Sequence, residues 1–202
     1  MQVVIVDLGL GNLNSVRWAL ERLGTNASIT SEADMIPAAD AIVMPGVGHF
    51  SAASARLTEK GLDTAIERRA GAVPILGICL GMQLLFERSE EGGRGLGLLP
   101  GRVTSLARPA GPLPHVGWNT VQVSASAGIM ARAGSGDAYF CHTYAVRPQD
   151  RLLGSAYTDY GDRFVSAVQK GLVCGVQFHP ERSGDYGAAV LEAFLGLAAC
   201  SR

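Results

Sequence analysis

Charged residues are scarce in this sequence, and neither sign predominates. Only 17% of the 202 residues are charged, and the formal net charge is −1. No stretch is rich in lysine or arginine, so nothing in the sequence favours nucleic-acid binding. Long apolar runs are also missing, because residues 3–6 are too few to span a membrane and follow no cationic segment. We therefore expect a cytoplasmic protein that binds neither nucleic acid nor membrane.

Cysteines are few and irregularly spaced. The four cysteines stand at positions 79, 141, 174 and 200, form no C-x-x-C pair and match no metal-ligand spacing. This spacing favours free thiols in a reducing compartment over a disulfide framework. We expect no metal, and a cysteine with a special role would be catalytic rather than structural.

The first half of the chain predicts a parallel α/β sheet. Apolar runs predict buried strands at Val3–Val6, Ala27–Thr30, Ala41–Met44 and Val73–Ile78. Helical spacing between and after them predicts helices over Leu13–Leu23, Leu57–Ala70 and Met82–Arg88. Alternating strands and helices favour a mostly parallel central sheet with helices on both faces.

The second half has a different pattern. Short strands separated by glycine, proline and turn residues predict an antiparallel extension of the sheet, at Arg102–Leu106, Thr120–Val123, Tyr139–Val146, Leu152–Tyr157, Phe164–Gln169 and Val173–Phe178. A final helix is expected over Tyr186–Leu197. No repeat, low-complexity segment or linker interrupts the chain, so residues 1–202 are predicted to form one domain.

A cysteine between two glycines ends one of the predicted strands. Residues 77–81, Gly-Ile-Cys-Leu-Gly, have the form of a nucleophile elbow, G-x-Nuc-x-G, with Cys79 as nucleophile. Side chains in place of the two glycines would collide with the neighbouring strand or helix. A helix N-terminus behind the turn favours a thiolate and offers the Leu80 N–H to an oxyanion. Taken alone, the motif also fits a buried structural cysteine.

A histidine and a glutamate two positions apart follow the last predicted strand. In residues 175–181, Gly-Val-Gln-Phe-His-Pro-Glu, Pro180 biases His179 toward extended backbone, so that His179 and Glu181 point to the same side. His179 can then serve as the base for the thiol of Cys79, while Glu181 orients the other ring nitrogen. In isolation, His179 would be interpreted as a surface histidine.

A third segment, residues 45–48, Pro-Gly-Val-Gly, follows a strand of the same predicted sheet. A peptide N–H near Val47 or Gly48 can turn there toward a developing oxyanion. An ordinary loop has the same composition, so the segment points to an oxyanion hole only in combination with the other two.

The G-x-G at residues 9–11 lacks the third glycine of a dinucleotide fingerprint, since Asn14 stands in its place. No cofactor is therefore expected.

Together, the three segments resemble the signatures of the class I, or triad, glutamine amidotransferase family. The segments Asp7–Val16, Pro114–Asn119 and Tyr139–Tyr144 resemble the branch of glutaminase subunits that serve imidazole glycerol phosphate formation in histidine biosynthesis. The similarity runs from residue 3 to about residue 195. It implies that Cys79 attacks the carboxamide of glutamine, forms a glutamyl thioester and releases ammonia.

The resemblance also implies roles outside the triad. It places the oxyanion hole at Leu80, Val47 and Gly48, and the glutamine contacts at Gln83, His142, Thr143 and Tyr144. It directs four residues toward a partner: Asn12, Trp118, Asn119 and Tyr139. That partner would be a (β/α)8-barrel cyclase subunit, which forms a heterodimer with this chain and receives ammonia through the barrel. A physical argument also favours a partner. Ammonia set free in neutral water is mostly protonated and no longer nucleophilic, so it needs a shielded path to an acceptor. One domain leaves no room for a second active site, so we expect the acceptor site on another polypeptide.

Three other functions stay open at this point. An amidotransferase of the same class that serves anthranilate, carbamoyl phosphate or a nucleotide would share the triad, although residues 7–16 and 114–119 argue against it. A cysteine hydrolase of peptides or esters would share the elbow. A non-enzymatic binding subunit would keep the fold, but has no need of Cys79, His179 and Glu181 together.

Overall fold

The computed structural model of the protein describes residues 1–107, 110–124, 128–150 and 153–200. The first half alternates strands and helices: β1 (Gln2–Val6), α1 (Leu13–Arg22), β2 (Asn26–Thr30), the 3-10 helix η1 (Ala33–Ala38), β3 (Ala41–Gly46), α2 (Phe50–Glu59), α3 (Leu62–Arg69), β4 (Ile75–Cys79) and α4 (Leu80–Leu84). The four strands are parallel in the order β2-β1-β3-β4. The predicted parallel α/β sheet is confirmed.

The second half extends the sheet. It comprises β5 (Arg88–Ser89), β6 (Gly101–Ser105), β7 (His115–Val123), α5 (Gly128–Ala133), β8 (Gly136–His142), β9 (Tyr144–Pro148), β10 (Gly154–Tyr160), β11 (Asp162–Lys170), β12 (Val173–Val176), the 3-10 helix η3 (Pro180–Arg182) and α6 (Gly184–Cys200). Strand β12 pairs parallel with β4, and β11, β10, β7 and β8 follow in antiparallel order to complete nine strands. A separate three-stranded sheet has the order β5-β6-β9. The predicted antiparallel extension is confirmed.

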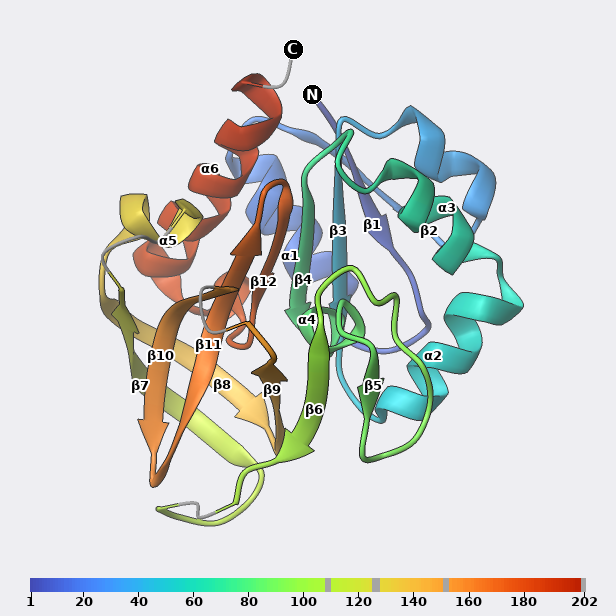
Figure 1. The fold of residues 1–202 in the computed structure, drawn as a ribbon. Coiled ribbons are helices and arrows are strands. Elements are labelled where there is room, and N and C mark those ends of the chain that lie inside the picture. Colours follow the sequence, from blue (N-terminus) through green and yellow to red (C-terminus); the bar gives the residue numbers. More distant parts are fainter. Residues whose placement is uncertain (108–109, 125–127, 151–152, 201–202) are drawn as a thin grey trace.

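Apolar residues on both sides of the parallel strands explain why helices cover both faces. In β1, Val3 and Ile5 belong to the core beneath α1 and α6, whereas Val4 and Val6 belong to the core beneath α2 and α3. Figure 1 shows α1 and α6 on one side of these strands and α2 and α3 on the other. A continuous apolar run is what a strand buried on both faces requires.

Two predicted helices differ from the structure. The helix expected over Leu57–Ala70 is wrong, because helical structure begins at Phe50 and is interrupted at Gly61, whose φ of 65° ends α2 and starts α3. The helix expected over Met82–Arg88 is too long. The Leu84 carbonyl, which would continue α4, accepts a hydrogen bond of 2.8 Å from the Leu96 N–H instead.

The strand expected over Tyr139–Val146 is also wrong, because it is two strands in different sheets. Strand β8 pairs with β7, β9 pairs with β6, and the chain passes from one sheet to the other at Thr143. Helix α5 was not predicted. Of the strand expected at Leu152–Tyr157, Leu152 lies outside the described residues, and β10 continues to Tyr160.

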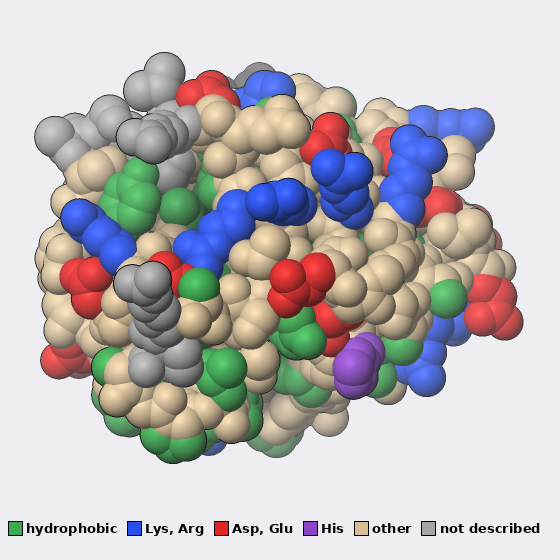
Figure 2. Space-filling view, turned by 60° about the horizontal axis from the view of Figure 1, so that its bottom comes forward, with side chains coloured by type: hydrophobic (Ala, Val, Ile, Leu, Met, Phe, Trp, Pro, Cys, Tyr) green, Lys and Arg blue, Asp and Glu red, His purple; other side chains and the backbone are tan. Residues whose placement is uncertain are grey.

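The surface carries charges of both signs. Figure 2, which brings the bottom of Figure 1 forward, shows basic side chains in a broken band with acidic side chains beside and between them. This mixture agrees with the net charge of −1, and the face in view carries no broad basic patch that would attract a polyanion. Over the part of the chain that is described, no helix is both long and apolar enough to cross a bilayer.

Candidate active site

Cys79 occupies a strained turn between β4 and α4. Its φ of 54° is the only positive φ of a non-glycine residue in the described ranges. A Cβ on Gly77 would lie 2.5 Å from the Gly81 carbonyl oxygen, and a Cβ on Gly81 would overlap the Met44 carbonyl oxygen. The elbow prediction is therefore confirmed in its geometry: both glycines are needed for the turn that lifts the sulfur from the end of β4.

Strand order brings the other two segments to Cys79. Strand β4 lies between β3 and β12, with Gly46 paired opposite Cys79 and Val176 paired opposite Ile78. Residues that follow β3 and β12 therefore leave the sheet at the same edge as Cys79. The structure thus brings together the three segments from which the sequence predicted an active site.

His179 and Glu181 form a buried pair. Nδ1 of His179 lies 2.8 Å from Oε1 of Glu181, and the two side chains are only 8% and 7% exposed. The backbone is extended at His179, and its N–H donates to the Tyr139 carbonyl at 2.9 Å. This arrangement confirms that the two side chains point the same way and that Glu181 fixes one ring nitrogen.

The charge state of His179 is set by its neighbours. Burial alone would lower the pKa of His179, but Cys79 and Glu181 outweigh burial and raise this pKa to about 10. Nε2 of the ring is buried and forms no hydrogen bond within normal distance limits to any described residue, which leaves it available to the sulfur. These neighbours therefore favour the protonated form of the ring beside Cys79.

The sulfur of Cys79 has two further polar neighbours that the sequence analysis did not identify. The Gln177 side-chain amide donates toward the sulfur at 3.6 Å, and the Cys141 carbonyl lies 3.8 Å from it. Gln177 is fully buried. Its position two residues before His179, on the same side of an extended segment, was the available indication.

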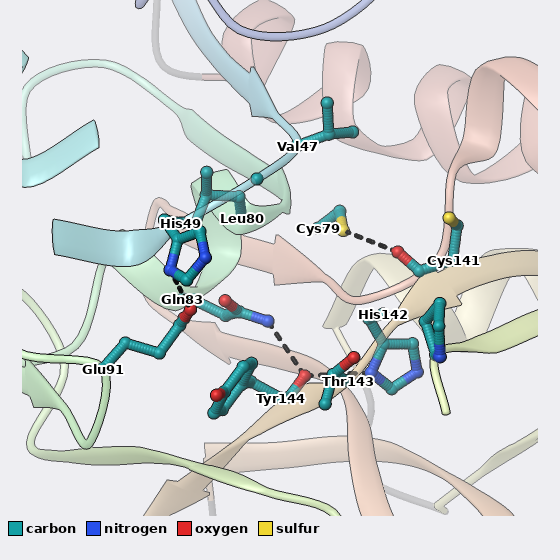
Figure 3. Close-up of a pocket in the computed structure, with 12 residues that line it drawn as sticks. Val47, His49, Cys79, Leu80, Gln83, Glu91, Cys141, His142, Thr143 and Tyr144 are labelled. Atoms are coloured by element: carbon teal, nitrogen blue, oxygen red, sulfur yellow. Dashed lines mark hydrogen bonds and ion pairs between the residues drawn. The ribbon is translucent and has the colours of Figure 1, made fainter. Parts of the chain in front are cut away.

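A pocket of about 420 Å³ opens over the sulfur. Figure 3 shows Cys79, Gln83 and Glu91 around it, with residues 141–144 along one wall. Every residue predicted for the oxyanion hole or for glutamine binding lines this pocket: Val47, Gly48, Leu80, Gln83, His142, Thr143 and Tyr144. The volume suits a small molecule.

Glu91 gives the pocket a carboxylate that the sequence analysis missed. Its side chain is only 5% exposed, and Oε1 lies 2.8 Å from Nδ1 of His49, which is 77% exposed. Both residues line the pocket, together with Pro114 and Cys141. No spacing motif marks Glu91, because it comes from the loop after β5, and a loop gives no periodicity from which to infer direction.

The four residues predicted to face a partner are placed unequally. Trp118 is 61% exposed and its ring lies 6.4 Å from that of Tyr139, over which the Arg182 guanidinium stacks at 3.9 Å. Asn12 is exposed, and its side chain caps α1 by accepting from the Ser15 N–H. Asn119 is partly buried, and its side chain donates to the Asp159 carbonyl at 3.0 Å. The structure thus groups Trp118 and Tyr139 beside the segment that carries His179.

Comparisons with known proteins agree with this geometry. The family model "Glutamine amidotransferase class-I" matches residues 4–196. The imidazole glycerol phosphate synthase subunit HisH of Moorella thermoacetica is 46% identical over 95% of this chain and 93% of its own length. The HisH subunit of Idiomarina loihiensis is 45% identical over 99% and 100%.

Solved structures show the same fold. A crystal structure of a glutamine amidotransferase matches with a TM-score of 0.78 at 23% identity, covering 97% of this chain and 98% of that chain. The structure of PurLQS from Thermotoga maritima matches with a TM-score of 0.76 at 20% identity, covering 96% and 97%.

Proposed function

This chain belongs to the class-I glutamine amidotransferase family, and we propose that it is the glutamine-hydrolysing subunit of an imidazole glycerol phosphate synthase in histidine biosynthesis. The observation that carries the proposal is the convergence of Cys79, His179 and Glu181 beside a pocket of about 420 Å³. A binding subunit would have no use for a strained cysteine next to a buried imidazolium.

The first half of the reaction forms a thioester. The Cys79 sulfur attacks the carboxamide carbon of glutamine, and the carbonyl oxygen takes up negative charge. The Leu80 N–H and a peptide N–H at Val47–Gly48 stabilise that oxyanion. The His179 imidazolium gives its Nε2 proton to the departing nitrogen, so that the C–N bond breaks, ammonia leaves and a glutamyl thioester remains.

The second half restores the enzyme. Acylation removes the negative charge of the sulfur, which is one of the two influences that raise the pKa of His179. The neutral ring then takes a proton from water as the water attacks the thioester carbon. The C–S bond breaks, glutamate leaves, and the pair of thiolate and imidazolium returns. Glu181 holds the ring by Nδ1 throughout.

Glu91 is suited to recognise the amino-acid end of glutamine. A free amino acid carries an α-ammonium group, and Glu91 places a nearly buried carboxylate in the lining of the pocket. A charge-assisted hydrogen bond to that carboxylate would anchor the substrate while the carboxamide reaches Cys79. Gln83 and residues 142–144 would form the remaining walls of the glutamine site.

The ammonia is delivered to a partner. We propose that the partner is a (β/α)8-barrel cyclase subunit, which forms a heterodimer with this chain on the face that carries Trp118 and Tyr139. The support is a large exposed aromatic side chain next to the segment that holds His179.

We also propose a cytoplasmic location, which suits the free thiols of Cys79, Cys141 and Cys174.

Release of glutamate from glutamine tests the proposal. Three proteins are assayed with and without the cyclase subunit and its nucleotide ligand: the purified chain, Cys79→Ala and Cys174→Ala. Cys174→Ala is the matched control, because it removes a buried thiol elsewhere in the protein. We expect stimulation by the partner that only Cys79→Ala abolishes, while synthesis from added ammonia survives in both variants. Activity with an anthranilate or carbamoyl phosphate partner instead, or cleavage of peptides without glutaminase activity, would contradict the proposal.

A further inference from the structure

Two buried histidines connect strand β7 with the wall of the pocket. Nδ1 of His115, in β7, lies 3.2 Å from Nε2 of His142, at the end of β8. Nε2 of His115 lies 3.3 Å from the side-chain nitrogen of Asn119. Nδ1 of His142 lies 2.9 Å from the Tyr144 carbonyl oxygen. His142 lines the pocket, whereas His115 does not.

The protons in this chain of contacts have one consistent arrangement. The Tyr144 carbonyl only accepts, so Nδ1 of His142 must donate to it. Burial lowers the pKa of His142 to about 3 and also lowers the pKa of His115, so both rings are neutral. Nε2 of His142 is then an acceptor, Nδ1 of His115 is its donor, and Nε2 of His115 accepts from Asn119. Every ring nitrogen is satisfied.

The same carbonyl continues the path to the nucleophile. The Tyr144 oxygen also accepts from the Gln83 side-chain nitrogen at 2.9 Å, as Figure 3 shows. That nitrogen donates in addition to the Gln177 side-chain oxygen at 3.2 Å, and the Gln177 nitrogen donates toward the Cys79 sulfur at 3.6 Å. An unbroken series of side-chain and carbonyl contacts therefore joins β7 to the sulfur.

Aromatic rings hold His115 in place. The Tyr160 and Phe140 rings stack on it with centroids at 4.0 and 5.0 Å, so the ring cannot turn without disturbing both neighbours. An apolar ring would suit this aromatic site without any polar atoms to satisfy. Phenylalanine would, however, leave Nε2 of His142 buried without the hydrogen-bond donor that His115 provides.

We propose that His115 is a positioning residue that acts through His142 and the Tyr144 carbonyl to hold Gln83 and the pocket wall in the orientation that binds glutamine. This role rests on the proposed glutaminase function, because it names glutamine as the ligand. Asn119, adjacent to the exposed Trp118, forms the other end of the series, so a displacement of β7 would reach the pocket by the same path.

The test uses the full chain and a diazoketone analogue of glutamine, which binds as glutamine does and then alkylates Cys79. The rate of labelling of the Cys79 peptide is measured against analogue concentration for wild type, His115→Phe and His115→Asn. His115→Phe keeps a ring in the stack but removes the donor, and we expect its half-saturating concentration to rise about tenfold. His115→Asn keeps a donor near the Nδ1 position, and we expect it to recover most of that loss.

Iodoacetamide, which lacks the amino-acid part, is the control reagent. It should label Cys79 at the same rate in the three proteins if His115 affects the pocket rather than the sulfur. Equal half-saturation in wild type and His115→Phe would overturn the proposal, as would an equal rise in the Phe and Asn variants. If His115→Phe does not fold, Asn119→Ala decides: a rise of a few fold supports the role, and no change refutes it. Wild-type labelling that neither saturates nor is blocked by glutamine would contradict the glutaminase function itself.

Discussion

Nδ1 of His179 and Oε1 of Glu181 lie 2.8 Å apart in a site that hides more than nine-tenths of each side chain. A buried imidazolium is costly unless a negative group pairs with it. Glu181 supplies that charge on one side and Cys79 on the other, and together they raise the pKa of His179 against the effect of burial. The pair therefore fixes the orientation of the His179 ring and favours its protonated form.

Glu181→Gln should separate these two effects. The amide side chain at position 181 can still accept from Nδ1 of His179. The substitution removes the negative charge, however, so the pKa of His179 should fall. We expect kcat for glutaminase to drop by a factor of about 10²–10⁴. Nitrogen NMR of the imidazole ring should show wild-type His179 protonated above pH 7.5 and the variant ring losing its proton at lower pH. Asp185→Asn, an exposed carboxylate at the start of α6, is the control and should leave the titration of His179 unchanged.

Gly81→Ala tests the elbow through stability. The added Cβ would overlap the Met44 carbonyl oxygen, which belongs to the backbone of β3 and cannot move aside without distorting the sheet. We expect the free energy of unfolding to fall by about 2–3 kcal/mol, as for other overpacked sites. Gly196→Ala is the matched control, because its Cβ would meet only the end of the flexible Arg132 side chain. Urea denaturation should show little loss for Gly196→Ala, and equal losses in both would refute the steric argument.

The sequence predicts the local geometry at Cys79 and His179 well because nearby residues determine it. The glycines at 77 and 81 specify the turn at Cys79, and Pro180 specifies the extended backbone at His179; both constraints act within a few residues. The segments after the strands meet because parallel strands end at the same edge of the sheet. The alternation of strands and helices in residues 1–79 indicates that the strands are parallel.

Residues whose positions depend on contacts with distant parts of the sequence were not predictable in the same way. Glu91 comes from a loop without periodicity, and its direction depends on contact with His49. His115 is 27 positions from His142, and the two meet only because β7 and β8 pair in register. A single sequence contains no local pattern that fixes such a register. The change of sheet at Thr143 was missed for the same reason, because β9 finds its partner in the distant β6.

Glu91→Gln should weaken glutamine binding more than catalysis. The Glu91 carboxylate lies in the pocket lining and takes no part in bond breaking. It should therefore stabilise the bound substrate and the transition state about equally, so its loss weakens substrate binding rather than the chemical step. We expect KM for glutamine to rise about 10- to 100-fold with kcat changed less than about threefold. Glu90→Gln is the matched control, because Glu90 is exposed and accepts from the Ser105 N–H outside the pocket. A fall in kcat with KM unchanged would show that Glu91 does not bind the substrate.

Acid should destabilise the protein through His142. Its pKa is about 3 in the folded state and near 6.5 when unfolded, so between these values the unfolded chain binds more protons. Stability is therefore complete above about pH 6.5 and is lost as the pH falls toward 3. At pH 4.5 the loss from this group is on the order of 3 kcal/mol. His142→Asn does not titrate and keeps a donor near the Tyr144 carbonyl, so urea midpoints should fall less steeply with acid than in wild type. Identical slopes would exclude His142 as the source.

Trp118→Ala tests the proposed partner face. Trp118 is 61% exposed, so its removal should change thermal stability little, while a large aromatic side chain at the centre of an interface contributes strongly to binding. We expect Kd for the cyclase subunit, measured by titration calorimetry, to rise at least about tenfold. Trp18→Ala provides a discriminating control, because Trp18 is 56% exposed on α1, outside the β7 face. If Trp18→Ala weakens the complex and Trp118→Ala does not, the partner binds at α1, and ammonia would have to leave the site by a path that does not pass the Tyr139 side of His179.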